Sequence, residues 1–117
     1  MSASAAPDQI DLVAHALADP TRRGLLRLVR DEERPAGELA AAFPQISRPA
    51  VSQHLRLLRE AGLVSIRPAG NRRLYRAQAD GLGDMWRFID GMWTDRLTKL
   101  RRAAEQAERA KPKRRKQ

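Results

Sequence analysis

The sequence predicts a mainly helical domain that carries one small β-hairpin. Three observations support this fold class. Apolar residues recur at three- and four-residue steps through most of the first 61 residues, which is helical spacing. After Gly62 the pattern changes to two short β-prone runs, 63–68 (LVSIRP) and 72–77 (RRLYRA). From Gly81 onward a long helical pattern returns. The expected order is therefore four helices, two strands and a last helix.

The first two expected helices meet at an Asp-Pro pair. Asp19 is a good N-cap and Pro20 suits the first helical position, so the second helix should start there and run to about residue 30. The first helix, over 8–18, has helically spaced apolar residues at Ile10, Val13, Ala14 and Leu17. The second is expected to bury Leu25, Leu26, Leu28 and Val29.

A short third helix and a longer fourth helix follow. Pro35 should open the third helix, at about 36–42, with Leu39 directed inward. Ser47 should cap the fourth helix, which tolerates Pro49 in its first turn. That helix is expected to end at residue 60 or 61, because Gly62 is a natural C-terminal stop.

The hairpin and the last helix complete the domain. Residues 69–71 predict a hairpin turn, with Leu74 pointing to the core beside Ile66 and Tyr75 facing the opposite side. The last helix should begin near Gly81. Its apolar stripe consists of Leu82, Met85, Trp86, Ile89, Met92, Trp93, Leu97 and Leu100. We expect a disordered N-terminus over 1–7, one domain over 8–107 and a basic tail over 108–117.

The positive charge of the chain is concentrated in two segments. The 117 residues include 23 Lys and Arg against 14 Asp and Glu, a net charge of +9. Residues 47–76 contain seven basic side chains and one acidic side chain, and residues 111–117 contain five basic side chains and none that is acidic. This distribution indicates an anionic partner, with nucleic acid first and an acidic membrane surface second.

Composition argues against several other classes of protein. The absence of cysteine excludes disulfides and thiolate metal sites. No run approaches the roughly 18 apolar residues of a membrane helix and no signal pattern is present, so we expect a cytoplasmic protein without a membrane partner. The two histidines fall on separate helices and no glycine-rich phosphate loop occurs, so an enzyme is not expected.

The third and fourth helices together predict a helix-turn-helix, and the hairpin directly after them makes it a winged helix. One stripe of the fourth helix is apolar, and the remaining surface is basic and rich in amides. Such a face suits the major groove, where Arg can bind guanine and Gln can bind adenine through paired hydrogen bonds. The candidate DNA-binding residues are Ser47, Arg48, Pro49, Ser52, Gln53, His54 and Arg56, with Arg72 and Arg73 from the wing.

Several of these assignments have an alternative. His54 lies at the edge of the apolar stripe, so packing explains it as well as DNA contact does. His15 has apolar neighbours on the first helix and is expected to be structural rather than a ligand. Arg72 and Arg73 could instead protect an exposed strand edge. The basic tail has two possible roles: an arm that binds DNA, or a segment that keeps the protein soluble.

Three segments of the chain resemble the ArsR/SmtB family of bacterial winged-helix repressors. They are 16–29 (ALADPTRRGLLRLV), 37–64 (GELAAAFPQISRPAVSQHLRLLREAGLV) and 72–76 (RRLYR). The resemblance covers roughly residues 10–95, and 47–64 is its most specific part. It implies a homodimer that binds an operator and blocks transcription, often of its own operon. It also implies that the first and last helices form the dimer interface.

The last helix carries more apolar surface than a small monomer can cover, which agrees with that implied dimer. The expected interface residues are Ile10, Val13, Leu17, Leu82, Met85, Trp86, Ile89, Met92 and Trp93. A two-fold dimer places two recognition helices one DNA turn apart, about 34 Å, and requires a near-palindromic operator.

The metal-sensing pattern of the family is missing here. The third helix has no cysteine and the last helix has no histidine, so we expect no metal and no other cofactor. Without a metal, repression would be controlled by the amount of the protein, by an organic effector that binds near Trp86 and Trp93, or by autorepression. The predicted function is a sequence-specific repressor of transcription. A non-specific architectural DNA-binding protein and a protein-interaction module are the alternatives.

Overall fold

The computed structural model describes residues 8–111. The predictions for the N-terminus over 1–7 and for most of the basic tail concern residues outside that range. The chain divides into two compact units, Met1–Met85 and Trp86–Gln117. The boundary between them falls inside the last helix.

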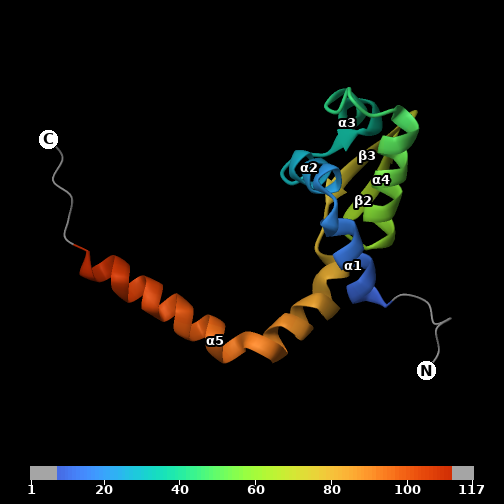
Figure 1. Cartoon of the computed structure of the whole chain (residues 1–117). Coiled ribbons are helices and arrows are strands. Elements are labelled where there is room, and N and C mark those ends of the chain that lie inside the picture. Colours follow the sequence, from blue (N-terminus) through green and yellow to red (C-terminus); the bar gives the residue numbers. More distant parts are fainter. Residues whose placement is uncertain (1–7, 112–117) are drawn as a thin grey trace, which may run out of the picture. The chain divides into compact units, whose positions relative to one another are not determined.

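The first unit contains most of the helices and all the strands that the structure describes (Figure 1). In chain order they are α1 (Gln9–Ala18), α2 (Pro20–Leu28), β1 (Arg34–Pro35), α3 (Ala36–Ala41), α4 (Arg48–Glu60), β2 (Val64–Ala69), β3 (Arg72–Ala77), the 3₁₀ turn η1 (Asp80–Leu82) and the start of α5 (Gly83–Ala110). The order confirms a mainly helical fold with a small antiparallel sheet.

The sheet has one more strand than predicted. Its strand order is β1-β3-β2, and β1 pairs Arg34 with Tyr75 and Pro35 with Leu74. Pro35 therefore ends an edge strand and, as the N-cap of α3, also opens that helix as predicted. Proline suits an edge strand because it has no N–H to donate. A strand of two residues is too short to show an alternating pattern in the sequence.

The hairpin turn is one residue shorter than predicted, and this reverses the faces of β3. Ala69 pairs with Arg72, so only Gly70 and Asn71 form the turn, with Gly70 at a φ of 63°. A three-residue turn would have paired Ile66 with Leu74, but the observed partner of Ile66 is Tyr75. A shift of one residue exchanges the two faces of a strand. Tyr75 packs against the core, and the predicted inward position of Leu74 was wrong.

The core of the first unit is apolar and draws on four helices and the start of β2. It contains the predicted Leu25, Val29 and Leu39, whereas Leu26 and Leu28 are only partly buried. The complete core set is Val13, Ala16, Leu25, Val29, Leu39, Val51, Leu55, Leu58, Ala61, Leu63 and Val64.

Side-chain caps begin the helices where the sequence predicted them. The Asp19 carboxylate accepts a hydrogen bond from the Arg22 backbone N–H at 3.0 Å, with Pro20 at the first helical position. The Ser47 hydroxyl accepts one from the Ala50 N–H at 3.2 Å. Both predicted N-caps are confirmed. Each satisfies one of the free N–H groups of a helix start.

Two glycines allow α4 to turn back against η1. Gly62 ends α4 with a φ of 74°, as its predicted role as a stop requires. The Gly81 N–H donates to the Gly62 carbonyl at 2.9 Å, and a Cβ atom on Gly81 would lie 1.8 Å from the Ala61 carbonyl oxygen. The Gln9 side chain donates to the same Ala61 oxygen at 2.7 Å, which ties α1 to this junction.

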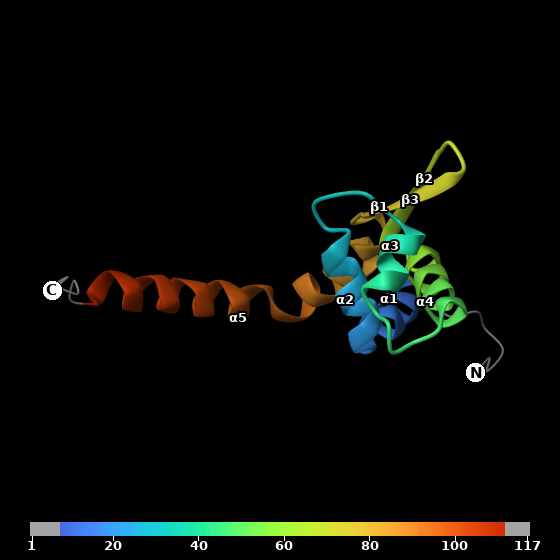
Figure 2. The ribbon, with the colours of Figure 1, turned by 90° about the horizontal axis from the view of Figure 1, so that it is seen from above.

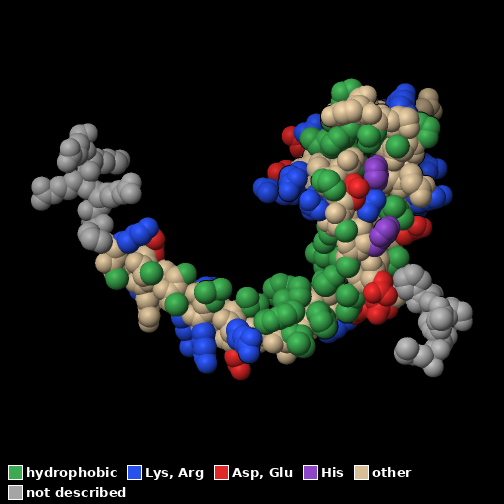
Figure 3. Space-filling view, in the orientation of Figure 1, with side chains coloured by type: hydrophobic (Ala, Val, Ile, Leu, Met, Phe, Trp, Pro, Cys, Tyr) green, Lys and Arg blue, Asp and Glu red, His purple; other side chains and the backbone are tan. Residues whose placement is uncertain are grey.

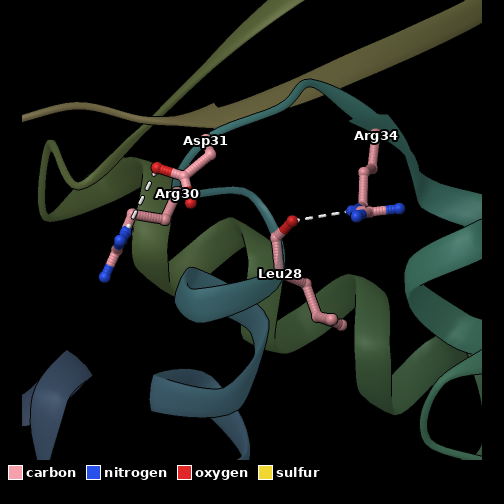
Figure 4. Close-up of polar contacts among 4 residues, drawn as sticks. All are labelled: Leu28, Arg30, Asp31 and Arg34. Carbon is pink, nitrogen blue, oxygen red and sulfur yellow. Dashed lines mark hydrogen bonds and ion pairs between the residues drawn. The ribbon is translucent and has the colours of Figure 1, made fainter.

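Arg34 holds β1 to the end of α2 (Figure 4). Its Nε donates to the carbonyl of Leu28, the last residue of the helix, at 2.7 Å. That carbonyl has no partner within the helix. The ion pair between Arg30 and Asp31 in the same view, at 3.2 Å, is exposed on both sides.

The second unit consists of the remainder of α5, which has no buried residue. Its apolar side chains are visible as a run along the helix in Figure 3. Phe88 and Trp93 contact each other edge to face, with ring centroids 6.0 Å apart. Among residues 8–111, no helix combines the length and apolarity needed to cross a membrane.

Candidate nucleic-acid interface

The face of α4 that the core leaves free is basic and polar. Val51, Leu55 and Leu58 are buried along one side of the helix, as predicted from their spacing. A helix turns by 100° per residue, so the intervening positions project away from that stripe. The exposed residues of the helix are Arg48, Pro49, Ser52, Gln53, Arg56, Arg59 and Glu60, and the cap Ser47 is exposed as well.

Gln53 and Arg56 are joined on this exposed face. Arg56 Nη2 donates a hydrogen bond to Gln53 Oε1 at 2.5 Å. The contact leaves the Gln53 amide nitrogen and the other Arg56 donors free to bind acceptors elsewhere. This pairing was not predicted from the sequence, although the three-residue separation of Gln53 and Arg56 places them side by side on a helix.

Arg48 extends over the first turn of α3. Its Nη2 lies 3.3 Å from the position that a Cβ atom on Gly37 would occupy. The glycine therefore leaves room for the guanidinium where the two helices of the helix-turn-helix approach each other.

The wing contributes a second basic surface. Arg72 and Arg73 are exposed at the turn end of β3, and Figure 2 shows the β2–β3 hairpin extending beyond the helices of the first unit. A groove of about 500 Å³ separates the wing from the start of α3. It is lined by Pro35, Ala36, Gly37 and Glu38 on one side and by Asn71, Arg72, Arg73 and Tyr75 on the other.

A bidentate ion pair ties the wing to the body of the unit. Arg67 on β2 donates to both carboxylate oxygens of Glu33, from Nε at 3.0 Å and from Nη2 at 2.9 Å. Hydrogen bonding and charge from Arg67 lower the pKa of Glu33, and the carboxylate raises the pKa of Arg67. Nothing in the local sequence pattern indicated this pair, because the partners are separated by 34 residues.

The two histidines have different environments. The His54 ring is half-buried on the side of α4 that faces α2, where its Nδ1 lies 3.1 Å from Arg22 Nη1. Its contact with DNA stays a prediction. The His15 side chain is exposed, which does not fit the prediction of a structural histidine among apolar neighbours. His15 instead contributes its backbone carbonyl, which accepts a hydrogen bond from Arg22.

The residues predicted for a dimer interface differ in their exposure. Trp86 and Met92 are 66% and 59% exposed, and Trp93 is also exposed. Val13 is fully buried in the core of the first unit, so its side chain has no surface left for a partner. The half-buried members of the set are Ile10, Leu17, Leu82, Met85 and Ile89.

Possible metal ligands are not gathered anywhere in the part of the chain that the structure describes. Across residues 8–111, no three His, Asp or Glu side chains come together in a group that could hold an ion, and the sequence has no cysteine.

Comparison with known proteins agrees with this geometry. A helix-turn-helix domain family matches residues 17–67. The transcriptional regulator Rv2034 of Mycobacterium tuberculosis is 44% identical over 98 residues, which are 84% of this chain and 88% of that protein. The transcriptional repressor SdpR of Bacillus subtilis is 42% identical over 53 residues, 45% of this chain and 58% of the repressor.

A solved structure extends the likeness to the whole winged fold. The ArsR-like transcriptional regulator from Rhodococcus sp. RHA1 superposes with a TM-score of 0.64 at 32% identity, over 84% of this chain and 92% of that one. The family of the chain follows from its helix-turn-helix, its wing and the extent of these matches. The chain belongs to the ArsR/SmtB family of winged helix-turn-helix proteins, and it is a DNA-binding transcriptional regulator rather than an enzyme.

Proposed function

We propose that this regulator is a homodimeric repressor that recognises a near-palindromic operator and acts without metal. The single observation that carries the proposal is the division of α4 into a buried apolar stripe and an exposed face bearing Arg48, Ser52, Gln53 and Arg56. Such a face offers both the donors and the acceptors that sequence reading in the major groove requires. The name of SdpR as a repressor supports the direction of regulation.

The proposed contacts fall into two groups. Ser52, Gln53 and Arg56 face outward from the middle of α4 and are assigned to base edges. The start of α4, at Ser47, Arg48 and Pro49, and the wing, at Arg72 and Arg73, are assigned to phosphates. His54 is left out of both groups because its Nδ1 contacts Arg22.

The dimer is proposed from the apolar face of α5. Trp86, Trp93 and Leu100 follow one another at intervals of seven residues, with Ile89 and Leu97 between them. That spacing keeps side chains on one side of a helix and is typical of helices that pair. Among the large apolar residues of this stripe, Trp86 and Leu100 are two-thirds exposed in the single chain. A second copy would remove this surface from water.

Two-fold symmetry then determines the form of the operator. Each copy presents one α4, so the dimer reads two half-sites of opposite orientation, with centres about 34 Å or one DNA turn apart. Ile10 and Leu17 on α1 are also proposed to belong to the dimer interface.

Metal-independent control is proposed from the ligands that the chain offers. A zinc-type site uses about four N, S or O ligands in a tetrahedral arrangement. This chain has no thiolate, and its two imidazoles fall on α1 and α4. Carboxylates such as Asp90 and Asp95 favour hard ions at weak affinity. Regulation through protein amount, with the protein repressing its own gene, needs no such site.

Selection of binding sites from random DNA tests this function directly. The full chain is incubated with a random duplex pool, and the enriched sequence is compared with a scrambled duplex by fluorescence anisotropy. We expect enrichment of an inverted repeat and a complex that contains two chains. Equal affinity for the enriched and scrambled duplexes would identify a non-specific architectural protein and overturn the proposal.

A second measurement tests regulation. Operator affinity is measured in chelator and then with micromolar zinc, copper or arsenite, and we expect no change. A tenfold loss that chelator reverses, about 1.4 kcal/mol of coupling, would contradict metal independence. Autorepression is tested with a reporter driven by the DNA directly upstream of the gene, which the protein should silence.

A further inference from the structure

Arg22 is a buried charged side chain that the proposed contacts with DNA do not use. It is 6% exposed, and no other charged residue among residues 8–111 is classed as buried. Its Nε donates to the Ala16 carbonyl at 2.9 Å and its Nη2 to the His15 carbonyl at 2.7 Å. Its Nη1 lies 3.1 Å from His54 Nδ1 on α4. One guanidinium therefore joins α1, α2 and α4.

The two carbonyl contacts hold the end of α1. The last four carbonyls of a helix have no partner within it, and positive charge is favourable at that end. Arg22 takes two of these carbonyls, and Arg23 takes that of Leu17 at 2.7 Å. Both arginines come from the first turn of α2, directly after Asp19, which ends one helix and caps the next.

The third contact assigns a role to one ring nitrogen of His54. An arginine N–H can only donate, so in this contact His54 Nδ1 is the acceptor. Asp19 lies near this pair. Its pKa is lowered first by the hydrogen bond from the Arg22 backbone and also by the charge of Arg22.

These contacts are directional, unlike the apolar packing beneath α4. Hydrophobic attraction has no preferred direction, whereas the hydrogen bonds of a planar guanidinium with three partners restrict the relative orientation of the groups that it joins. Base readout depends on such accuracy, because a binding group must be held within about 0.5 Å of its productive position. His54, the α4 residue that Arg22 contacts, lies one residue after Gln53 and two residues before Arg56, which are both assigned to base edges.

We propose that Arg22 is a positioning residue for DNA recognition: through His54 it sets the orientation of α4 relative to α1 and does not itself touch DNA. The inference rests on the proposed readout by α4. α1 is also part of the proposed dimer interface. The contacts of Arg22 would therefore fix the orientation of the recognition helix α4 relative to a helix of that interface.

The test compares two substitutions of His54. His54→Asn keeps a side-chain acceptor where Nδ1 was and removes Nε2, whereas His54→Gln places its amide at the Nε2 position. We expect His54→Asn to bind the selected operator within about twofold of the wild type, the range of an ordinary surface substitution. We expect His54→Gln to lose about tenfold, the size of one lost base contact, with little change on scrambled DNA.

Helix propensity alone predicts the opposite order of operator affinities, with His54→Gln binding better than His54→Asn, because glutamine is a better helix former than asparagine. A purely structural role for the residue would therefore favour His54→Gln. Direct base contact by Nε2 would also favour it, because asparagine lacks that group. Circular dichroism and thermal melting establish that both variants are folded at the assay temperature.

A double-mutant cycle that combines Arg22→Lys with His54→Gln tests whether the change in operator affinity comes from the Arg22 guanidinium. Lysine keeps the charge but not the planar fork, so the substitution should weaken operator binding in the wild type and have little further effect in the His54→Gln background. Equal affinities for the two His54 variants, a better His54→Gln, or additive losses in the cycle would overturn the positioning role. A wild type without preference for any site would instead refute the proposed function.

Discussion

Gln53 and Arg56 share a hydrogen bond on the exposed face of α4, and this bond restricts both side chains before DNA is bound. An ordered side chain loses less conformational entropy on binding than a free one. Gln53 keeps its amide N–H₂ as a donor in this arrangement, and Arg56 keeps the rest of its guanidinium. In the proposed complex the two residues would therefore form a joint donor surface for DNA.

Replacing Gln53 by alanine should separate specific from general binding. We expect Gln53→Ala to weaken operator binding by about 1–3 kcal/mol and to leave binding to scrambled DNA nearly unchanged, since a base contact is lost. Arg72→Ala is the matched comparison, because a lost phosphate contact weakens both duplexes alike and lowers the salt dependence. Anisotropy titrations at several salt concentrations measure both. An unchanged ratio of specific to scrambled affinity for Gln53→Ala would refute its role in readout.

Glycine substitutions should distinguish a required glycine from a dispensable one. Gly81→Ala places a Cβ atom 1.8 Å from the Ala61 carbonyl oxygen, a clash with backbone, so we expect a marked loss of stability. Gly91→Ala on α5 meets nothing within 4 Å and should stabilise the helix by about 0.5–1 kcal/mol. Thermal melting of the two variants provides the comparison. A Gly81→Ala protein as stable as the wild type would show that the turn can move aside.

The helices were predictable from local signals, and the sheet details were not. Asp19 and Ser47 start helices through side-chain hydrogen bonds, and Gly62 ends a helix through its backbone conformation. These effects act within a few residues, so they can be predicted from the local sequence. The length of the hairpin turn depends instead on which of two registers packs better, and the observed one places Tyr75 on the core. β1 exists only because β3 offers it partners from across the fold.

The candidate site divides in the same way. The exposed face of α4 follows from residue spacing, so its members could be named from the sequence. The contacts that orient the site join residues far apart in the chain, namely Arg22 with His54 and Glu33 with Arg67. A pattern in one segment cannot show which distant segment packs beside it.

The Glu33–Arg67 pair makes the attachment of the wing depend on pH. The folded-state pKa of Glu33 is lowered by the hydrogen bond and charge of Arg67. A group with a lowered pKa contributes stability above its unfolded pKa, near 4.5, and loses it as pH falls through the folded value. Glu33→Gln should therefore be less stable than the wild type at pH 7.

The same difference should disappear in acid. Urea unfolding of both proteins from pH 7 down to about pH 3 measures the gap at each pH, and we expect the two curves to converge as the pH falls through the lowered folded-state pKa of Glu33. A gap that persists unchanged at low pH would mean that the glutamate acts through packing rather than charge. High salt should reduce the effect at pH 7, because the pair is exposed.

At the scale of the whole molecule, the proposed dimer depends on the apolar face of α5. Trp86 on this face is 66% exposed, and covering an aromatic side chain of this kind stabilises an interface by about 25 cal/mol for each Å² of apolar surface removed from water. A carboxylate placed there would have to be buried without a partner, which is costly. Trp86→Glu should therefore prevent pairing.

Gln106→Glu is the control for that substitution. It adds the same carboxylate to the same helix, at an exposed position away from the apolar stripe. Light scattering should give about twice the 13.2 kDa chain mass for the wild type and for Gln106→Glu, but a single chain for Trp86→Glu. The monomer should still contact one half-site through its intact α4, but without the second half-site its operator affinity should fall toward that for scrambled DNA. A Trp86→Glu protein that remains a dimer would place the interface on another surface.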